Sequence, residues 1–267
     1  MSIRFEGVSK SFGPKHVLKD VSFEVAKGEI LFILGKSGVG KSVTLKHIIG
    51  MLKPDRGSVW VDGENVTALD YAGLTEIRRK CGMVFQHPAL LDSLTVYQNV
   101  SFGLRTPQYR MTLDRPQTEA EIRAIVLEKL GLVNLGADIL DFYPPEISYG
   151  MQKRVSLART LAPGPDFLLF DEPTTGLDPI STNSVNELIL DLSRKLQVTS
   201  VVVSHDMGCA LKIADRILVL DQGKILAVGT VPEIKASKEP LIQDFLSEIL
   251  EIINAQGSPE PGGARKR

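Results

Sequence analysis

Cysteine is scarce in this sequence of 267 residues, and positive and negative charges nearly balance. The two cysteines, Cys81 and Cys209, are too few for a disulfide framework, which fits a reducing cytosol. The net charge of -1 provides no overall field that favours nucleic acid, so we expect no nucleic-acid partner. No apolar run approaches the ~18 residues of a membrane-spanning helix, and the N-terminus lacks the basic-then-apolar pattern of a signal peptide. We therefore expect a cytoplasmic protein that would serve a membrane process from outside the bilayer.

Glycine is concentrated in a stretch of the chain between an apolar run at 30–34 and helical periodicity at 43–52. Strand, glycine loop and helix are the setting of a phosphate-binding loop, in which backbone N–H groups and the helix N-terminus face phosphate oxygens. Its lysine, Lys41, would reach the β- and γ-phosphates, and the hydroxyl of Ser42 would help to hold Mg²⁺. The alternative is a glycine turn that binds nothing. The candidate nucleotide-binding residues are Gly35, Lys36, Ser37, Gly38, Val39, Gly40, Lys41 and Ser42.

Polar side chains follow three other apolar runs. Asp171 and Glu172 come after 167–170, His205 comes just after 198–203, and Gln86 follows 83–85. The carboxyl ends of parallel strands form the ligand crevice of an open sheet, so these side chains should meet beside the phosphate loop. There Asp171 can bind Mg²⁺, and Glu172 can accept a proton from the water that attacks the γ-phosphorus. The imidazole of His205 could hold that water, and the side-chain amide of Gln86 could reach both Mg²⁺ and the water. Each residue alone is equally compatible with a solvated strand end.

The hydrophobic pattern changes twice along the chain. Residues 1–35 have the alternation of short strands, whereas helices and polar loops dominate from 86 to 160, with 106–118 predicted as loop because of its prolines. Apolar strands then alternate with a helix over 185–196, which predicts an α/β fold with a parallel sheet covered on both faces. Residues 255–267 are rich in glycine and proline and are expected to be disordered.

Residues 236–254 are predicted to hold an amphipathic helix that starts near Pro240. The helix could cover the core of its own subunit, or it could contact a second subunit or a small cytoplasmic partner. Its acidic polar face makes a lipid surface a poor alternative. Its apolar face is made of Leu241, Ile242, Phe245, Leu246, Ile249, Leu250 and Ile253.

Taken together, these motifs resemble the nucleotide-binding subunit of an ATP-binding cassette (ABC) transporter over residues 1–235. The resemblance also includes residues 147–152, where the family has the signature Leu-Ser-Gly-Gly-Gln. Ser148 and Gly150 are retained, but Tyr149 replaces the first glycine and Met151 the glutamine. A glycine permits close backbone approach, so Tyr149 could weaken the site, or its ring could point harmlessly away.

The resemblance implies a P-loop NTPase (RecA-like) parallel-sheet core with an antiparallel β subdomain and an inserted α-helical subdomain at about 87–160. It implies ATP and Mg²⁺ as ligands, and a head-to-tail pair of cassettes in which Ser148 and Gly150 act on the ATP of the partner. The loop that ends at Asp178 would cross the interface. Phe12 would stack on adenine, unless it is a core residue. Transmembrane permease subunits would hold the ATPase on the inner face of the cell inner membrane.

Within this family, residues 40–50, residues 91–100 and Met151 resemble the ATPase of Mla-type (Mce-associated) phospholipid transport systems. That resemblance implies lipid transport between Gram-negative membranes and an Mce-domain lipid-binding protein as a partner. Three alternatives remain: the ATPase of another importer or exporter, a soluble regulatory cassette, and a small-molecule kinase that keeps only the phosphate loop.

Overall fold

The computed structural model describes residues 2–257, with side chains described as far as residue 248. A six-stranded sheet has the order β10-β9-β3-β8-β7-β6, in which all strands are parallel except β10, which pairs antiparallel with β9. A second, antiparallel sheet has the order β2-β1-β4-β5. The strands are β1 Ile3–Phe12, β2 Lys15–Val25, β3 Ile30–Leu34, β4 Arg56–Val61, β5 Glu64–Asn65, β6 Cys81–Val84, β7 Phe167–Asp171, β8 Thr199–Ser204, β9 Arg216–Asp221 and β10 Lys224–Thr230.

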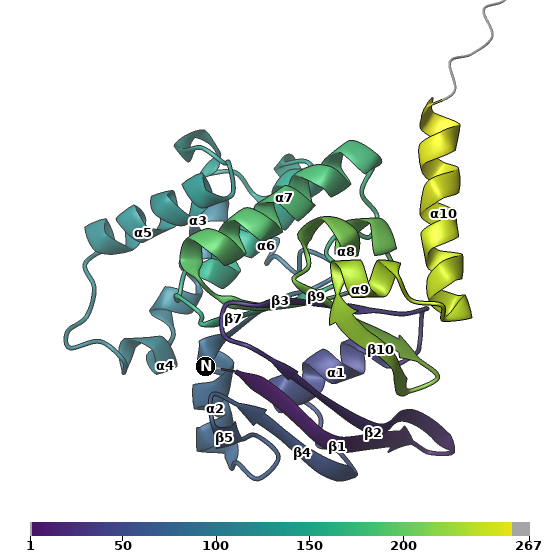
Figure 1. Ribbon diagram of the computed structural model, residues 1–267. Coiled ribbons are helices and arrows are strands. Elements are labelled where there is room, and N and C mark those ends of the chain that lie inside the picture. Colours follow the sequence, from purple (N-terminus) through teal and green to yellow (C-terminus); the bar gives the residue numbers. More distant parts are fainter. Residues whose placement is uncertain (1, 258–267) are drawn as a thin grey trace, which may run out of the picture.

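The six-stranded sheet is covered on both faces, as its unbroken apolar strands predict. Every residue of β3 is buried, and its side chains alternate between two hydrophobic clusters. One cluster lies toward the antiparallel sheet and α1, and the other lies toward α6, α7 and α8 (Figure 1). The helices are α1 Lys41–Ile48, α2 Tyr71–Lys80, α3 Val96–Ser101, α4 Pro107–Arg110, α5 Glu119–Leu132, α6 Tyr149–Leu161, α7 Pro179–Leu196, α8 Met207–Ile213, α9 Val231–Lys235 and α10 Pro240–Gly257.

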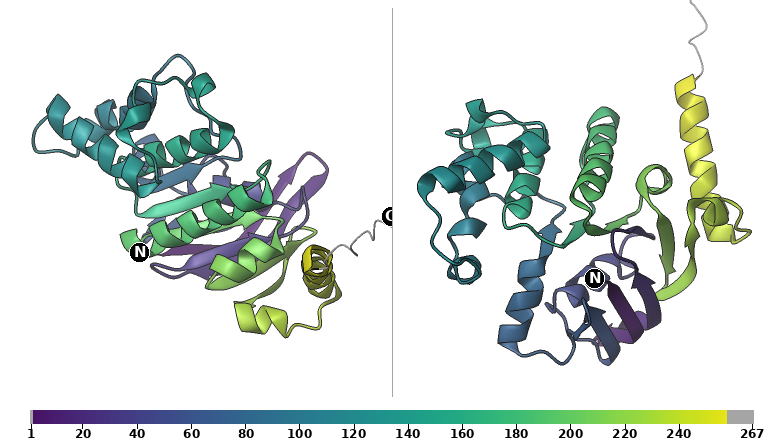
Figure 2. Two further views of the ribbon diagram at one scale, coloured as in Figure 1. Left: turned by 90° about the horizontal axis from the view of Figure 1, so that it is seen from above. Right: turned by 60° about the vertical axis from the view of Figure 1, so that its left-hand side comes forward.

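Helices α3 to α6 gather at one side of the molecule, and both views of Figure 2 show this teal region standing away from the antiparallel strands. The arrangement confirms the expected α/β fold with a parallel core and an antiparallel sheet, and it places the helical insertion between β6 and β7. Among the described residues, no helix is long and apolar enough to span a bilayer.

Two local expectations are corrected. The segment predicted as loop over 106–118 contains α4, because Thr106 caps the helix and Pro107 suits its first position. The C-terminal helix begins at Pro240 and continues through Gly257, three residues into the expected disordered tail, since alanine and glutamine favour helix. The rest of that tail, 258–267, lies outside the described residues.

The first half of α10 packs on its own subunit. Ile242 is fully buried and Phe245 is nearly so, in the same hydrophobic cluster as the buried residues of α8. Leu241 and Leu246 pack against that cluster as well. This packing supports the core-covering interpretation for the first two turns of the helix, whereas the side chains from residue 249 onward lie beyond those described.

Candidate functional site

The phosphate loop lies between β3 and α1, as its sequence predicts. Lys41 begins α1, is almost fully buried, and donates hydrogen bonds from Nζ to the carbonyl oxygens of Gly35 (2.7 Å) and Lys36 (3.1 Å). Gly40 has φ of 116°, and a Cβ there would lie 2.8 Å from Leu18 Cδ2. Only glycine fits at this position, since the loop turns sharply against β2. The loop thereby curls around the lysine ammonium.

Ser42 and Asp171 face one another at the carboxyl edge of the sheet. The Ser42 hydroxyl donates to Asp171 Oδ1 at 2.7 Å, which joins the first turn of α1 to the end of β7. A hydroxyl and a carboxylate are oxygen ligands of the kind that Mg²⁺ prefers. In the described part of the chain, no cluster of three or more His, Cys, Asp or Glu side chains offers another metal site. The pair has the oxygen donors that a Mg²⁺ ion would require.

Glu172 is the most constrained acidic side chain of the site. Its Oε1 lies 3.2 Å from Lys41 Nζ, and its Oε2 lies 2.8 Å from His205 Nδ1 and accepts from Thr175 Oγ1 at 3.3 Å. The backbone of Glu172 has φ of 50°, and its N–H donates to Val203 O at 2.9 Å. A left-handed conformation at a non-glycine residue costs about 1–3 kcal/mol and tends to occur at functional sites. The structure thus aims one carboxylate at the lysine of the phosphate loop.

A cleft with about 680 Å³ of open space runs over this edge of the sheet. Gln86, two residues after β6, lies on its wall together with His205, as predicted. Phe12 ends β1 at the same cleft and is 47% exposed, which excludes the core interpretation of this side chain. The ring of Phe12 is therefore available for a planar ligand. Val39 instead packs against the apolar cluster behind the loop.

Several residues of this cleft were not predicted from the sequence. Lys15 and Val17 come from the start of β2, Thr175 follows Glu172, and Phe245 and Glu248 come from α10. Lys15 and Val17 follow the turn after Phe12. Their closeness in sequence to a ligand-binding Phe12 could therefore have predicted that they line the same cleft. Nothing in the pattern of α10 distinguishes Phe245 and Glu248 from its other residues, because only the packing of the helix brings them here.

Three predicted site residues lie elsewhere. Ser148, Gly150 and Asp178 do not line the cleft; Ser148 caps α6 by accepting from Met151 N, and Asp178 caps α7 by accepting from Ile180 N and Ser181 N. Hydrogen bonds from Ser181 hold the pKa of Asp178 below its usual value. Their separation from the phosphate loop of the same chain is the arrangement expected if they act on the ATP of a partner.

Tyr149 occupies the first position of α6 with a backbone that does not need glycine, since its φ is not positive. Its ring lies 5.4 Å from the Lys153 ammonium, and its hydroxyl lies 3.4 Å from His87 Nδ1. Both contacts draw the ring toward its own chain. The first turn of α6 is regular, and its Met151 N–H donates to the Ser148 hydroxyl at 3.3 Å.

Tyr149→Gly is therefore expected to change the rate of ATP hydrolysis by less than about tenfold, or 1.4 kcal/mol of barrier. Phosphate release at saturating ATP measures it, with Tyr149→Phe as the matched variant that keeps the ring. A hundredfold gain in the glycine variant would show that the ring obstructs the signature segment.

A protein-family profile described as "ABC transporter" matches residues 18–175, which is more than half of the chain. This chain belongs to the ABC transporter family. It is the ATP-binding, ATP-hydrolysing subunit of such a transporter, and family membership removes the small-molecule kinase from the alternatives. The expected ABC ATPase is thereby confirmed.

Named relatives and a solved cassette resemble this ABC ATPase over most of its length. It is 39% identical over 247 residues to the "Probable ribonucleotide transport ATP-binding protein mkl" of Mycobacterium leprae, covering 92% of this chain and 69% of that one. The "Methionine import ATP-binding protein MetN" of Ralstonia nicotianae is 42% identical over 241 residues, covering 87% and 65%. The chain thus spans about two thirds of these curated relatives. A dimeric ATP-binding cassette solved after hydrolysis, with ADP and phosphate, matches 86% of this chain and 98% of its own, with TM-score 0.76 and 32% identity.

Proposed function

We propose that this ABC ATPase hydrolyses Mg-ATP with Glu172 as the general base. The observation that carries the proposal is the position of Glu172 between Lys41 and His205 at the carboxyl edge of the sheet. In this role its carboxylate accepts a proton from the water that attacks the γ-phosphorus, while Lys41 neutralises charge on the β- and γ-phosphates. His205 and Thr175 hold Oε2, which orients the carboxylate. Mg²⁺, when bound by Ser42, Asp171 and Gln86, would offset the charge of the phosphates.

The ATPase acts as a head-to-tail pair in this proposal. Phe12 stacks on adenine, the phosphate loop of one subunit holds the phosphates, and Ser148 and Gly150 of the partner cover the γ-phosphate. The N-terminus of α6 has thirteen residues of aligned helix behind it, and such an end favours an anion. Asp178 lies in the segment that would pass between the subunits. The dimeric state of the similar solved cassette supports this arrangement.

In this proposal, the permease subunits bind a groove on the helical region. It lies between α3 and the start of α5, and Phe102, on its wall, is 51% exposed. Arg105 holds both carboxylate oxygens of Glu119 there, at 2.7 and 2.9 Å, and the Tyr97 hydroxyl donates to the same carboxylate. An exposed aromatic beside a fixed charge pair suits a protein segment. Through it the ATPase would sit peripherally on the cytoplasmic face of the inner membrane.

The cargo is proposed to be phospholipid or another lipid, moved between Gram-negative membranes with an Mce-domain protein as partner. Residues 40–50, residues 91–100 and Met151 support this choice by their resemblance to Mla-type ATPases. The names of the relatives, which refer to ribonucleotide and methionine transport, favour a small-molecule importer as the second candidate. In this proposal, a small cytoplasmic partner binds the part of α10 that follows residue 248.

The two candidates can be distinguished by purifying the complex of this ATPase with its permease and measuring its bound lipid and its ATPase rate. We expect it, isolated in detergent with its permease, to contain bound phospholipid. Its ATPase rate should rise in phospholipid nanodiscs but not with methionine or a ribonucleoside monophosphate. The Glu172→Gln complex is the control for contaminating ATPases. Stimulation by a small solute together with its binding protein, and no lipid after extraction, would reject the lipid assignment.

A further inference from the structure

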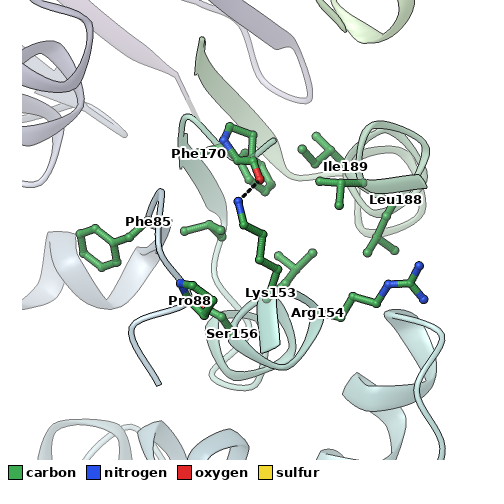
Figure 3. Close-up of a pocket in the computed structure, with 12 residues that line it drawn as sticks. Phe85, Pro88, Lys153, Arg154, Ser156, Phe170, Leu188 and Ile189 are labelled. Carbon is green, nitrogen blue, oxygen red and sulfur yellow. Dashed lines mark hydrogen bonds between the residues drawn. The ribbon is translucent and has the colours of Figure 1, made fainter. Parts of the chain in front are cut away.

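A buried lysine on the second turn of α6 joins the signature segment to the loop that follows Glu172. Lys153 is 8% exposed and lies beside a small cavity of about 20 Å³ lined by α6, α7, β7 and the segment after β6 (Figure 3). A cavity of this size holds at most a single water molecule. The cavity is therefore too small for a ligand, and Lys153 itself is the unusual feature of this region.

The Lys153 ammonium is held by main-chain oxygens. Nζ donates to Pro173 O at 2.7 Å, the bond dashed in Figure 3, and to Thr175 O at 3.1 Å. Among the described residues no carboxylate forms an ion pair with it, and burial lowers the pKa of Lys153. Burying an ammonium without a counter-charge is costly, so an apolar side chain of similar length would be the more stable choice for packing alone. The two carbonyl bonds are what the lysine adds to an apolar side chain at this position.

The loop held by Lys153 leads directly to the candidate base. Thr175, whose carbonyl accepts from Lys153, donates through its hydroxyl to Glu172 Oε2 at 3.3 Å. At the other end, α6 begins at the Ser148 cap, and the Tyr149 ring lies 5.4 Å from the same ammonium. A displacement of the first turn of α6 is thus passed to Glu172 through one side chain and one short loop.

We propose that Lys153 is a positioning residue that couples the two ATP sites of the dimer. The inference rests on the proposed function, in which Ser148 touches the ATP held by the partner while Glu172 of the same chain serves its own ATP. When the partner's ATP engages the start of α6, Lys153 fixes the loop from Pro173 to Thr175 and with it the carboxylate of Glu172. Each site then becomes competent only when the other is filled.

The test compares Lys153→Met, which keeps length and loses the donors, with Lys153→Arg, which keeps them. Phosphate release is measured against ATP concentration in the full chain. We expect a Hill coefficient clearly above 1 for the wild-type protein and for Lys153→Arg, and about 1 for Lys153→Met, together with a kcat lower by about tenfold. Lys195→Met is the matched control, because this exposed lysine pairs with Asp191 and does not line the cleft.

Binding of a non-hydrolysable ATP analogue to the monomer should be the same in all variants, since the phosphate loop is untouched. An unchanged Hill coefficient in Lys153→Met, or a coefficient of 1 in the wild-type protein, would overturn the coupling. Should Lys153→Met fail to fold, Lys153→Leu, which likewise has no donor for the carbonyl oxygens of Pro173 and Thr175, is judged by the same two outcomes. A wild-type protein that releases no phosphate would instead refute the proposed function, so the two failures are distinguishable.

Discussion

Glu172→Gln is expected to slow phosphate release by roughly 10²–10⁴-fold and to leave ATP binding intact. The amide keeps the size of the side chain and can still meet His205 and Thr175, but it cannot accept the proton of the attacking water. Removing a negative charge 3.2 Å from Lys41 Nζ also leaves that ammonium free for phosphate, so binding should not weaken. Single-turnover and steady-state phosphate release both measure the effect.

Glu187→Gln is the matched control, because Glu187 is exposed on α7 and does not line the cleft. Its rate should equal that of the wild-type protein. Turnover of Glu172→Gln within a few-fold of wild type would remove Glu172 from the role of base. His205 would then be the next candidate, since it lies on the same wall.

Lys41→Ala is expected to have the second large effect, a loss of nucleotide binding. The variant removes the cation that the loop surrounds, and it leaves Glu172 without its nearest ammonium beside the phosphate position. For the wild-type protein, Mg-ATP at ~100 times its Kd adds about 2.7 kcal/mol of stability, seen as a rise in Tm. We expect little or no rise for Lys41→Ala at the same concentration.

Lys46→Ala serves as the control in this comparison, because Lys46 belongs to the same helix but not to the cleft. Its rise in Tm with Mg-ATP should match that of the wild-type protein. A full rise for Lys41→Ala would mean that nucleotide binds elsewhere, and the assignment of the phosphate loop would fail.

The sequence was sufficient for those site residues whose position follows from a strand end. Apolar runs before Asp171, Glu172 and His205 predicted buried parallel strands, and parallel strands deliver their next residues to one edge. The glycines around Lys41 likewise predicted the phosphate loop, because few other residues tolerate its backbone angles.

Other parts of the site depended on tertiary packing. Phe245 and Glu248 reach the cleft only because the first turns of α10 pack near α8, and an amphipathic pattern does not specify which surface it covers. Lys153 belongs to a helix whose periodicity is ordinary, so only its two carbonyl partners reveal it. Phe12 could be placed in or out of the core only from its exposure.

The central claim is that ATP joins two copies of this chain through the phosphate loop of one and the signature segment of the other. Light scattering after size exclusion of Glu172→Gln tests it most directly. With Mg-ATP the mass should double from the 29.2 kDa of one chain, with Mg-ADP it should not, and Ser148→Arg should abolish the doubling. A protein that stays monomeric at saturating Mg-ATP, or a dimer indifferent to Ser148→Arg, would contradict the account.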